Sequence, residues 1–255
     1  MPEQPVIPGA EPVSVTGDDV GVLVLHGFTG NPGSVRPLAE ALVADGRTVV
    51  APRLPGHGTR VEDMLGTRWS DWAAAAEAAY ADLAGRTRAT VVAGLSMGGT
   101  LACWLAARHP EAAGLVAVNP LVQPPDPEMV AMGKAMIDAG ETIAPGIGSD
   151  IADPEAHETA YPGSPLHPLL SLVDAVEALQ ADLPRIACPV LLMTSPEDHV
   201  VPPANSDHLA SVVAGPVERV ALERSYHVAT LDYDRDLIAE RAVAFVRKLA
   251  AASSS

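Results

Sequence analysis

Residues 90–99 read TVVAGLSMGG, which places the pattern Gly-x-Ser-x-Gly at positions 94–98. A short β-branched run leads directly into the pattern, and a helical pattern follows over residues 97–108. A sharp turn between a strand and a helix exposes its central residue, and flanking glycines remove the Cβ atoms that would clash. We therefore interpret Ser96 as a nucleophile at the carboxyl edge of a sheet, above a helix N-terminus that favours an oxyanion. The competing interpretation is an ordinary glycine-rich turn in which Ser96 caps the helix.

The same alternation of strand and helix extends through most of the chain. Strands are expected at residues 21–25, 48–51, 90–93, 115–118, 190–193 and 217–222, and helices at 34–44, 70–83, 97–108 and 234–250. Ser34 is expected to cap the first of these helices. Strands that alternate with helices in this way predict an α/β fold with a mostly parallel central sheet and helices on both faces.

The alternation stops between residues 121 and 184. This stretch contains methionines, prolines and short amphipathic pieces but no β-rich run. About 60 residues are too many for an ordinary loop within a domain. We therefore expect residues 1–120 and 185–255 to form the core, with residues 121–184 inserted as a small helical cap.

A serine nucleophile needs a general base, and the base needs an orienting carboxylate. In this fold class the acid follows a later strand and the histidine follows the last one. Asp198 follows the strand expected at 190–193, and His227 is the only histidine after the last expected strand. Glu197 and His199, on either side of Asp198, are the rivals for the two roles. The histidines at 109, 157, 167 and 208 are interpreted as surface residues.

Stabilising an acyl-transfer oxyanion requires two backbone N–H donors. The amide that follows the nucleophile belongs to Met97. The second donor is expected in the loop HGFTG at 26–30, where glycines allow tight folding beside Ser96, and we assign it to Phe28. The Phe28 ring is also expected to line an acyl pocket.

The net charge of the chain, and the absence of several known binding motifs from its sequence, argue against several other functions. The chain of 255 residues carries 32 acidic and 16 basic side chains, a net charge of −16 that disfavours binding to nucleic acid or an anionic membrane surface. The sequence has no metalloprotease His-Glu-x-x-His, no phosphate loop and no dinucleotide-binding glycine pattern opening a helix. We therefore expect neither a cofactor nor a metal.

Targeting signals are also not apparent. The first 19 residues lack the basic and apolar regions of a secretion signal, and no run of 18 apolar residues suggests a membrane span. Cys103 and Cys188 lie in apolar surroundings without metal-ligand spacing, so both are expected to be buried thiols. A cytoplasmic protein is the expectation.

Five motifs in this order resemble one family. HGFTG (26–30), RLPGHGT (53–59), GLSMGGT (94–100), EDHVVPP (197–203) and SYHVATLDYD (225–234) resemble the α/β-hydrolases, specifically the bacterial monoacylglycerol lipases and related carboxylesterases. The resemblance implies an α/β-hydrolase fold with about seven strands and a short helical cap, and activity on acyl glycerols. It also implies that Ser96 is the nucleophile, that Asp198 and His227 are its partners, and that the Phe28 and Met97 amides form the oxyanion hole.

The stretch GIGSDIADPEAHETAYPGSP at 146–165 resembles the cap of that family. The acidic residue that meets the glycerol hydroxyls there corresponds to Glu158, and an apolar residue that touches the substrate corresponds to Ile147. Prolines at 124, 125 and 127 depart from the family pattern and are expected to stiffen the start of the cap.

Together these features predict a serine esterase that cleaves monoacylglycerols through an acyl-enzyme. One alternative is a broader carboxylesterase that acts on short to medium acyl esters. The other is a hydrolase-fold binding protein without catalysis. The expected partner is a small lipid ester, and the oligomeric state, monomer or dimer, stays open.

Overall fold

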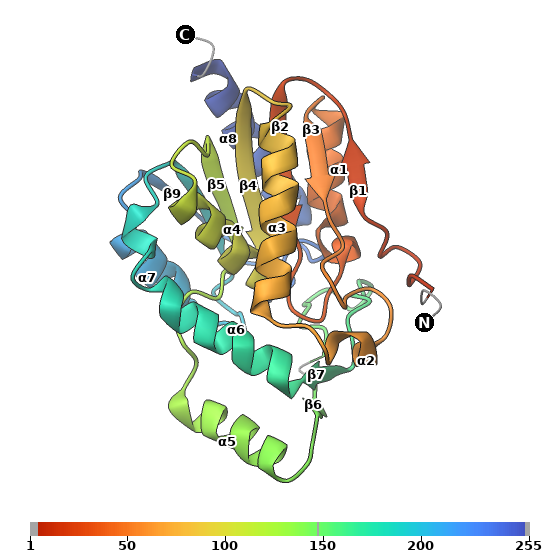
Figure 1. The fold of residues 1–255 in the computed structure, drawn as a ribbon. Coiled ribbons are helices and arrows are strands. Elements are labelled where there is room, and N and C mark those ends of the chain that lie inside the picture. Colours follow the sequence, from red (N-terminus) through yellow and green to blue (C-terminus); the bar gives the residue numbers. More distant parts are fainter. Residues whose placement is uncertain (1–4, 147, 253–255) are drawn as a thin grey trace.

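The computed structural model describes residues 5–146 and 148–252, and its centre is a seven-stranded sheet (Figure 1). The strand order is β1-β3-β2-β4-β5-β8-β9. The strands are β1 (Val13–Val15), β2 (Val20–Leu25), β3 (Thr48–Ala51), β4 (Ala89–Leu95), β5 (Gly114–Val118), β8 (Val190–Thr194) and β9 (Val217–Ala221). All neighbouring pairs are parallel except β1 with β3. The predicted mostly parallel sheet is therefore confirmed, with β1 as an unpredicted antiparallel edge strand.

Burial explains why the inner strands are easy to recognise in the sequence. Every residue of β2, β4 and β5 is buried, because helices cover both faces of the sheet. Such strands appear as continuous apolar runs. The edge strand β9 carries exposed charged side chains at Glu218 and Arg219, which accounts for its weaker pattern.

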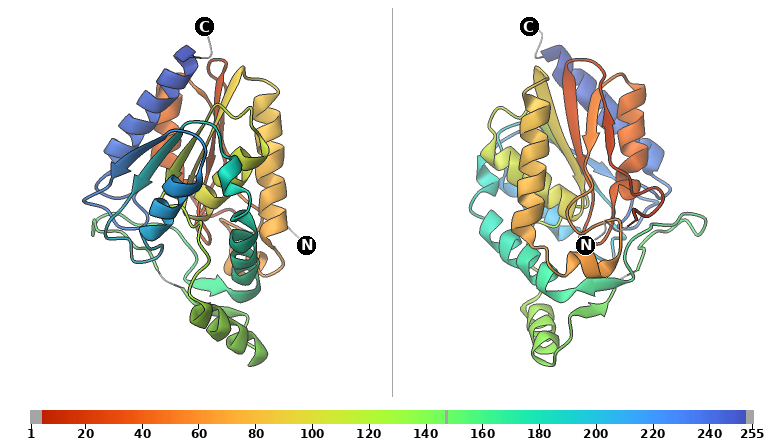
Figure 2. Two further views of the ribbon diagram at one scale, coloured as in Figure 1. Left: turned by 90° about the vertical axis from the view of Figure 1, so that its left-hand side faces the viewer. Right: turned by 45° about the vertical axis from the view of Figure 1, so that its right-hand side comes forward.

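Helices cover both faces of the sheet (Figures 1 and 2). On one face α1 (Arg36–Ala44) packs against α8 (Arg235–Ala252), and on the other α3 (Trp69–Ala84) packs against α4 (Met97–Arg108). Each pair closes its own apolar core against the sheet. The short helices α2 (Val61–Met64) and α7 (Ala204–Val212) lie in the connections that follow β3 and β8.

The start of the first helical segment differs from the prediction. Asn31, not Ser34, is the cap, and its side chain accepts a hydrogen bond from the Gly33 amide at 2.9 Å. A short 3₁₀ helix (Pro32–Val35) follows and leads directly into α1. Ser34 is therefore already inside the helical segment, where its Oγ accepts the Asn31 amide at 3.5 Å and its hydroxyl proton goes to another partner described below.

The insert, defined here as residues 121–184, contains strands as well as helices. Its elements are α5 (Pro127–Asp138), β6 (Ile143–Pro145), β7 (Gly163–Pro165) and α6 (Leu166–Leu179), and a 3₁₀ turn (Leu183–Arg185) spans its end. The strands β6 and β7 pair antiparallel, which the sequence analysis did not foresee. The helix α6 contacts α3 and α4, whereas α5 contacts α6 and projects away from the sheet (Figures 1 and 2).

The prolines at the start of the insert have an identifiable local role at one position. Pro127 occupies the first turn of α5, where its missing N–H costs nothing, and Asp126 caps the helix through the Glu128 amide at 2.8 Å. None of the helices in the described part of the chain is long and apolar enough to cross a membrane.

Candidate active site

Ser96 forms a strained turn between β4 and α4. Its backbone has φ 56° and ψ −121°, a conformation that residues with a side chain rarely adopt. A Cβ atom at Gly94 would overlap the Gly98 carbonyl, and one at Gly98 would overlap the Leu25 carbonyl. The two glycines of the sequence pattern are therefore required by close backbone packing. Ser96 is held at the sheet edge by its amide, which donates to the Val118 carbonyl at 3.0 Å.

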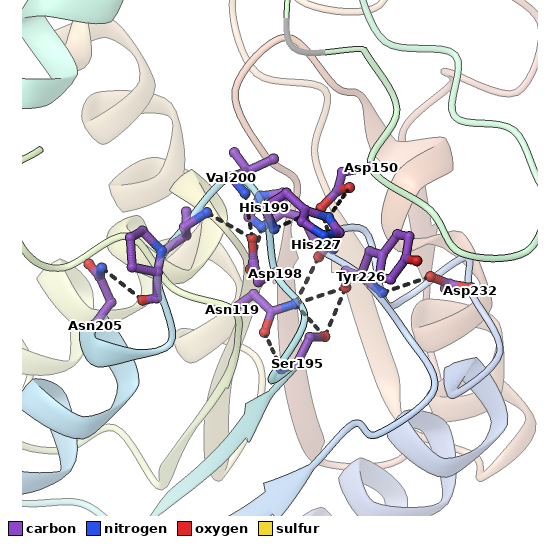
Figure 3. Close-up of polar contacts among 12 residues, drawn as sticks. Asn119, Asp150, Ser195, Asp198, His199, Val200, Asn205, Tyr226, His227 and Asp232 are labelled. Atoms are coloured by element: carbon purple, nitrogen blue, oxygen red, sulfur yellow. Dashed lines mark hydrogen bonds and ion pairs between the residues drawn. The ribbon is translucent and has the colours of Figure 1, made fainter. Parts of the chain in front are cut away.

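Asp198 and His227 meet across the loops that follow β8 and β9 (Figure 3). The distance from Asp198 Oδ2 to His227 Nδ1 is 2.7 Å, and the two side chains are 0% and 8% exposed. The other Asp198 oxygen, Oδ1, accepts the Val200 and Val201 amides, both at 2.8 Å. The carboxylate is thus fixed on one side by the backbone and faces the imidazole on the other.

The two rivals near Asp198 have other environments. Glu197 is exposed. His199 is also exposed, and its Nδ1 lies 2.8 Å from Asp150 Oδ1 rather than next to Asp198. Asp150 raises the pKa of His199 by accepting this hydrogen bond and by its charge.

A cavity of about 230 Å³ brings several predicted site residues together. Ser96, His227, Phe28 and Glu158 all line it. Most of the remaining wall is apolar and comes from the insert, with Leu166, Leu169, Leu170, Leu172 and Val173 of α6 and Met129 and Val130 of α5. The Phe28 ring packs edge-to-face on Trp72 at 5.8 Å between ring centroids, which fixes it in the wall.

The amides of Phe28 and Met97 have no protein acceptor. Neither group donates a hydrogen bond within residues 5–146 and 148–252, although Met97 is fully buried. Met97 opens α4, so its N–H also points out of the helix end, where partial positive charge collects. Two free N–H donors beside Ser96 are what an oxyanion hole requires.

His26 supports the loop that carries Phe28, a role that the sequence analysis missed. Its Nδ1 donates to the Gly27 carbonyl at 3.0 Å and its Nε2 accepts the Leu54 amide at 3.1 Å. Since a carbonyl only accepts and an amide only donates, the ring is neutral with its proton on Nδ1. Burial lowers the pKa of His26 to about 4.

This buried histidine predicts a specific loss of stability in acid. The unfolded chain takes up the His26 proton below its ordinary pKa of 6.5, whereas the folded protein resists it until about pH 4. The free energy of unfolding should therefore fall by about 3 kcal/mol from this group between pH 6.5 and 4. His57, whose pKa burial also lowers, acts in the same direction.

The measurement is a histidine NMR titration together with urea unfolding at several pH values. The ring resonances of His26 and His57 should not titrate between pH 8 and 5. If the His26 resonance titrates near pH 6.5, His26 is not the neutral support described here.

Glu158 is a partly buried carboxylate that lines the cavity. The Ser34 hydroxyl donates to Glu158 Oε1 at 2.6 Å, and burial raises the pKa of Glu158. The backbone beside it is tied to the core, because the Asn31 side chain donates to the Thr159 carbonyl at 2.8 Å. The other cap residue of the prediction, Ile147, lies outside the described residues.

Asn119 is a second residue that the sequence analysis missed. It follows β5 with a φ of 44°, a left-handed conformation that asparagine tolerates better than most residues. Its Nδ2 donates to Ser195 Oγ at 3.0 Å and to the His227 carbonyl at 2.9 Å, and its Oδ1 accepts the Ser195 amide at 2.8 Å (Figure 3). The available signal was an Asn-Pro pair directly after a buried strand.

The other predicted residues behave in two ways. Cys103 and Cys188 are free and buried as expected, and burial raises the pKa of the Cys188 thiol to about 11. His157 and His167 are exposed as expected. His109 and His208 are instead half-buried and hydrogen-bonded, to Glu77 and Glu111 in the first case and to Gln180 in the second.

Comparisons with known proteins agree with this geometry. A family model described as serine aminopeptidase, S33, matches residues 19–234. A thermostable monoacylglycerol lipase from Bacillus sp. (strain H-257) is 46% identical over 252 residues, which cover 97% of this chain and 99% of that protein. A carboxylesterase from Bacillus subtilis (strain 168) is 27% identical over 241 residues, which cover 94% of this chain and 97% of that protein.

A solved structure of a similar protein has the same fold as this chain. It comes from work on two metagenome-derived lipolytic enzymes, has 43% sequence identity and a TM-score of 0.91, and the match covers 96% of this chain and 100% of the other. The resemblance that the five sequence motifs suggested is therefore confirmed. The chain belongs to the serine aminopeptidase S33 family, and it is a hydrolase with the α/β-hydrolase fold.

Proposed function

We propose that this protein is a serine esterase that hydrolyses monoacylglycerols to a fatty acid and glycerol. The observation that carries the proposal is a largely apolar cavity lined by Ser96, His227 and the partly buried carboxylate of Glu158. Asp150 also lines this cavity, but its carboxylate already accepts hydrogen bonds from His199 and from the His227 amide. An apolar wall suits an acyl chain, and a buried acceptor suits hydroxyl groups. A monoacylglycerol presents both on one molecule.

In the proposed reaction, Ser96 Oγ attacks the ester carbonyl while His227 takes the hydroxyl proton. The Asp198 carboxylate, 2.7 Å from His227 Nδ1, keeps the proton on Nδ1 so that Nε2 is free to act as a base. The free N–H groups of Phe28 and Met97 donate hydrogen bonds to the negatively charged oxygen of the tetrahedral intermediate. His227 then returns the proton to the leaving glycerol oxygen, and water activated in the same way releases the fatty acid.

We further propose that residues 121–184 act as the cap over a core formed by residues 1–120 and 185–255. Apolar side chains of α5 and α6 form much of the cavity wall, which supports an acyl-binding role for the insert. The insert also supplies Glu158, which the Ser34 hydroxyl orients from the core. Ile147 is proposed as an apolar substrate contact on the resemblance alone.

The main alternative is a broader carboxylesterase with the same catalytic steps. Its cavity would select for the acyl chain but would not need an acceptor for glycerol hydroxyls. A protein that only binds lipid esters is the third possibility, and it would show no turnover. The family description names aminopeptidases, whereas the two relatives compared above are named as ester hydrolases. An aminoacyl anilide is therefore a useful control substrate.

The test of the monoacylglycerol proposal is Glu158→Gln, assayed on a 1-monoacylglycerol and on a p-nitrophenyl ester of the same acyl chain. Loss of a charged acceptor for the substrate hydroxyls should reduce transition-state stabilisation by about 1–3 kcal/mol. This corresponds to a roughly 5- to 150-fold lower kcat/KM for the monoacylglycerol. The p-nitrophenyl ester has no glycerol, so its kcat/KM should change less than about threefold. Glu155→Gln, at an exposed position of the same segment, is the matched control.

Stability separates a lost contact from a damaged cap. Because burial raises the pKa of Glu158, its ionised form destabilises the fold at pH values above the folded-state pKa. Glu158→Gln should therefore be at least as stable as the wild type at pH 8, and this advantage should disappear below about pH 4.5. Parallel losses on both substrates, or no loss on either, would favour the broader carboxylesterase.

We also propose a cytoplasmic location, as the sequence predicts. It is supported by the two buried free thiols, Cys103 and Cys188, since free cysteines are common in proteins of reducing compartments.

A further inference from the structure

The proposed acid and base lie on two separate loops beyond the end of the sheet. At the end of the neighbouring strands β8 and β9, the Leu222 amide donates to the Thr194 carbonyl at 2.8 Å. Asp198 lies four residues beyond Thr194, and His227 lies five residues beyond Leu222. The sheet alone therefore does not fix how the imidazole meets the carboxylate, and other contacts must do so.

Asp150, from the insert, contacts both loops at once (Figure 3). Its Oδ2 accepts the His227 amide and the His199 amide, both at 3.1 Å. Its Oδ1 accepts from His199 Nδ1 at 2.8 Å, and its backbone carbonyl accepts the Val228 amide at 3.0 Å. One carboxylate thus binds the backbone of the base and the backbone of the residue next to the acid.

The imidazole of His199 also contacts the loop of His227. It packs edge-to-face on Tyr226, the residue before His227, with ring centroids 4.6 Å apart. The Asp150 side chain is only 13% exposed, so its hydrogen bonds to charged and backbone groups are partly shielded from water. Hydrogen bonds that involve a charged group are stronger than neutral ones.

Asp150 is itself held in place from the loop that carries His227. The fully buried carboxylate of Asp232 accepts the Ala152 and Asp153 amides at 2.7 and 3.0 Å. It also accepts the Tyr226 amide at 2.9 Å (Figure 3). Both ends of residues 150–153 are therefore hydrogen-bonded to the loop of His227, which holds the Asp150 side chain in one position.

We propose that Asp150 is a positioning residue for this reaction, which sets the orientation of His227 toward Asp198 and Ser96 by joining the loops of the acid and the base. The inference rests on the proposed roles of those three residues. It gives the insert a second role besides lining the cavity. Such positioning affects the rate strongly, because a displacement of about 1 Å in a reacting group can lower the rate about 100-fold.

The side-chain chemistry of Asp150 predicts an order among its variants. Asn at 150 keeps one oxygen to accept the two amides, and its NH₂ can donate to His199 Nδ1 once that ring is neutral with its proton on Nε2. Glu keeps the charge and both oxygens but moves them by one methylene group. Ala removes every side-chain acceptor. If geometry matters most, kcat should decrease in the order wild type, Asp150→Asn, Asp150→Glu, Asp150→Ala.

The experiment measures kcat and KM of these variants on a short p-nitrophenyl ester, which makes no demand on Glu158. We expect Asp150→Ala to lower kcat about 10- to 100-fold with KM within about threefold, and Asp150→Asn to recover activity to within about fivefold of the wild type. The low-field proton resonance of the Asp198–His227 hydrogen bond should weaken in Asp150→Ala and persist in Asp150→Asn. Asp153→Asn, in the same segment but without side-chain contacts to either loop, should match the wild type.

Each contrary result has a definite meaning. An unchanged kcat in Asp150→Ala, or a rise in KM alone, would overturn the proposal. Asp150→Glu more active than Asp150→Asn would overturn it as well, since that order identifies charge as the cause; this comparison holds even if Asp150→Ala does not fold. Failure of the proposed function is distinguishable: a protein that only binds esters would show no turnover even as the wild type, whereas a broader carboxylesterase would be revealed by Glu158→Gln and would leave the order of the Asp150 variants unchanged.

Discussion

Ser96→Ala should abolish ester hydrolysis while the protein stays folded. The variant keeps the free amides of Phe28 and Met97 but loses the hydroxyl oxygen that is proposed to attack the ester. Loss of a serine nucleophile costs several orders of magnitude, and we expect kcat to fall at least about 10⁴-fold. The measurement is turnover of a p-nitrophenyl ester with active-site titration by a fluorophosphonate, which should label the wild type and not the variant.

The backbone of Ser96 supplies a matched folding control. Alanine keeps the side-chain Cβ and hence the strain at φ 56°, whereas glycine relieves strain worth about 1–3 kcal/mol at a cost of about 0.4–1 kcal/mol in chain entropy. The melting temperature of Ser96→Gly should thus be a few degrees above that of Ser96→Ala, since each kcal/mol corresponds to about 2–4 °C. Both variants should be inactive. More than about a tenth of the wild-type kcat in either variant would remove Ser96 from the nucleophile role.

The sequence indicates the sheet and its edge well because those features are local. β4 carries seven buried residues in a row, and Gly94 and Gly98 mark the turn beside Ser96 in the same short stretch. Asp198 and His227 could be placed for a related reason. In a parallel sheet the loops after neighbouring strands meet at one edge, so chain order and strand ends suffice.

The contacts that the sequence could not predict join distant segments. Asp150 and His227 are 77 residues apart, and Ser34 and Glu158 are 124 residues apart. No periodicity marks such pairs, since each depends on how the insert lies on the core. The strands β1, β6 and β7 were missed because three residues are too few for a pattern, and only pairing with a partner makes them strands.

Asp198→Asn should be nearly as damaging as the loss of Ser96, for a reason that lies in the two oxygens of the carboxylate. Oδ1 accepts two backbone amides at 2.8 Å, from Val200 and Val201, so the carbonyl oxygen of asparagine must stay there. Its NH₂ group then faces His227 Nδ1 and donates to it. The imidazole must hold its proton on Nε2 and can no longer accept the proton of Ser96. We expect kcat to fall about 10³- to 10⁴-fold.

The neighbouring Glu197→Gln is the matched control, because it removes one carboxylate from the same loop at an exposed position. Its kcat should stay within about threefold of the wild type. Hydrogen bonds to Val200 and Val201 survive in Asp198→Asn, so both variants should unfold within about 1 kcal/mol of each other in urea. The low-field proton of the His227–Asp198 hydrogen bond should be lost in Asp198→Asn alone. If Glu197→Gln is the inactive variant, the acid has been assigned to the wrong residue, and the 2.7 Å contact between Asp198 and His227 is only structural.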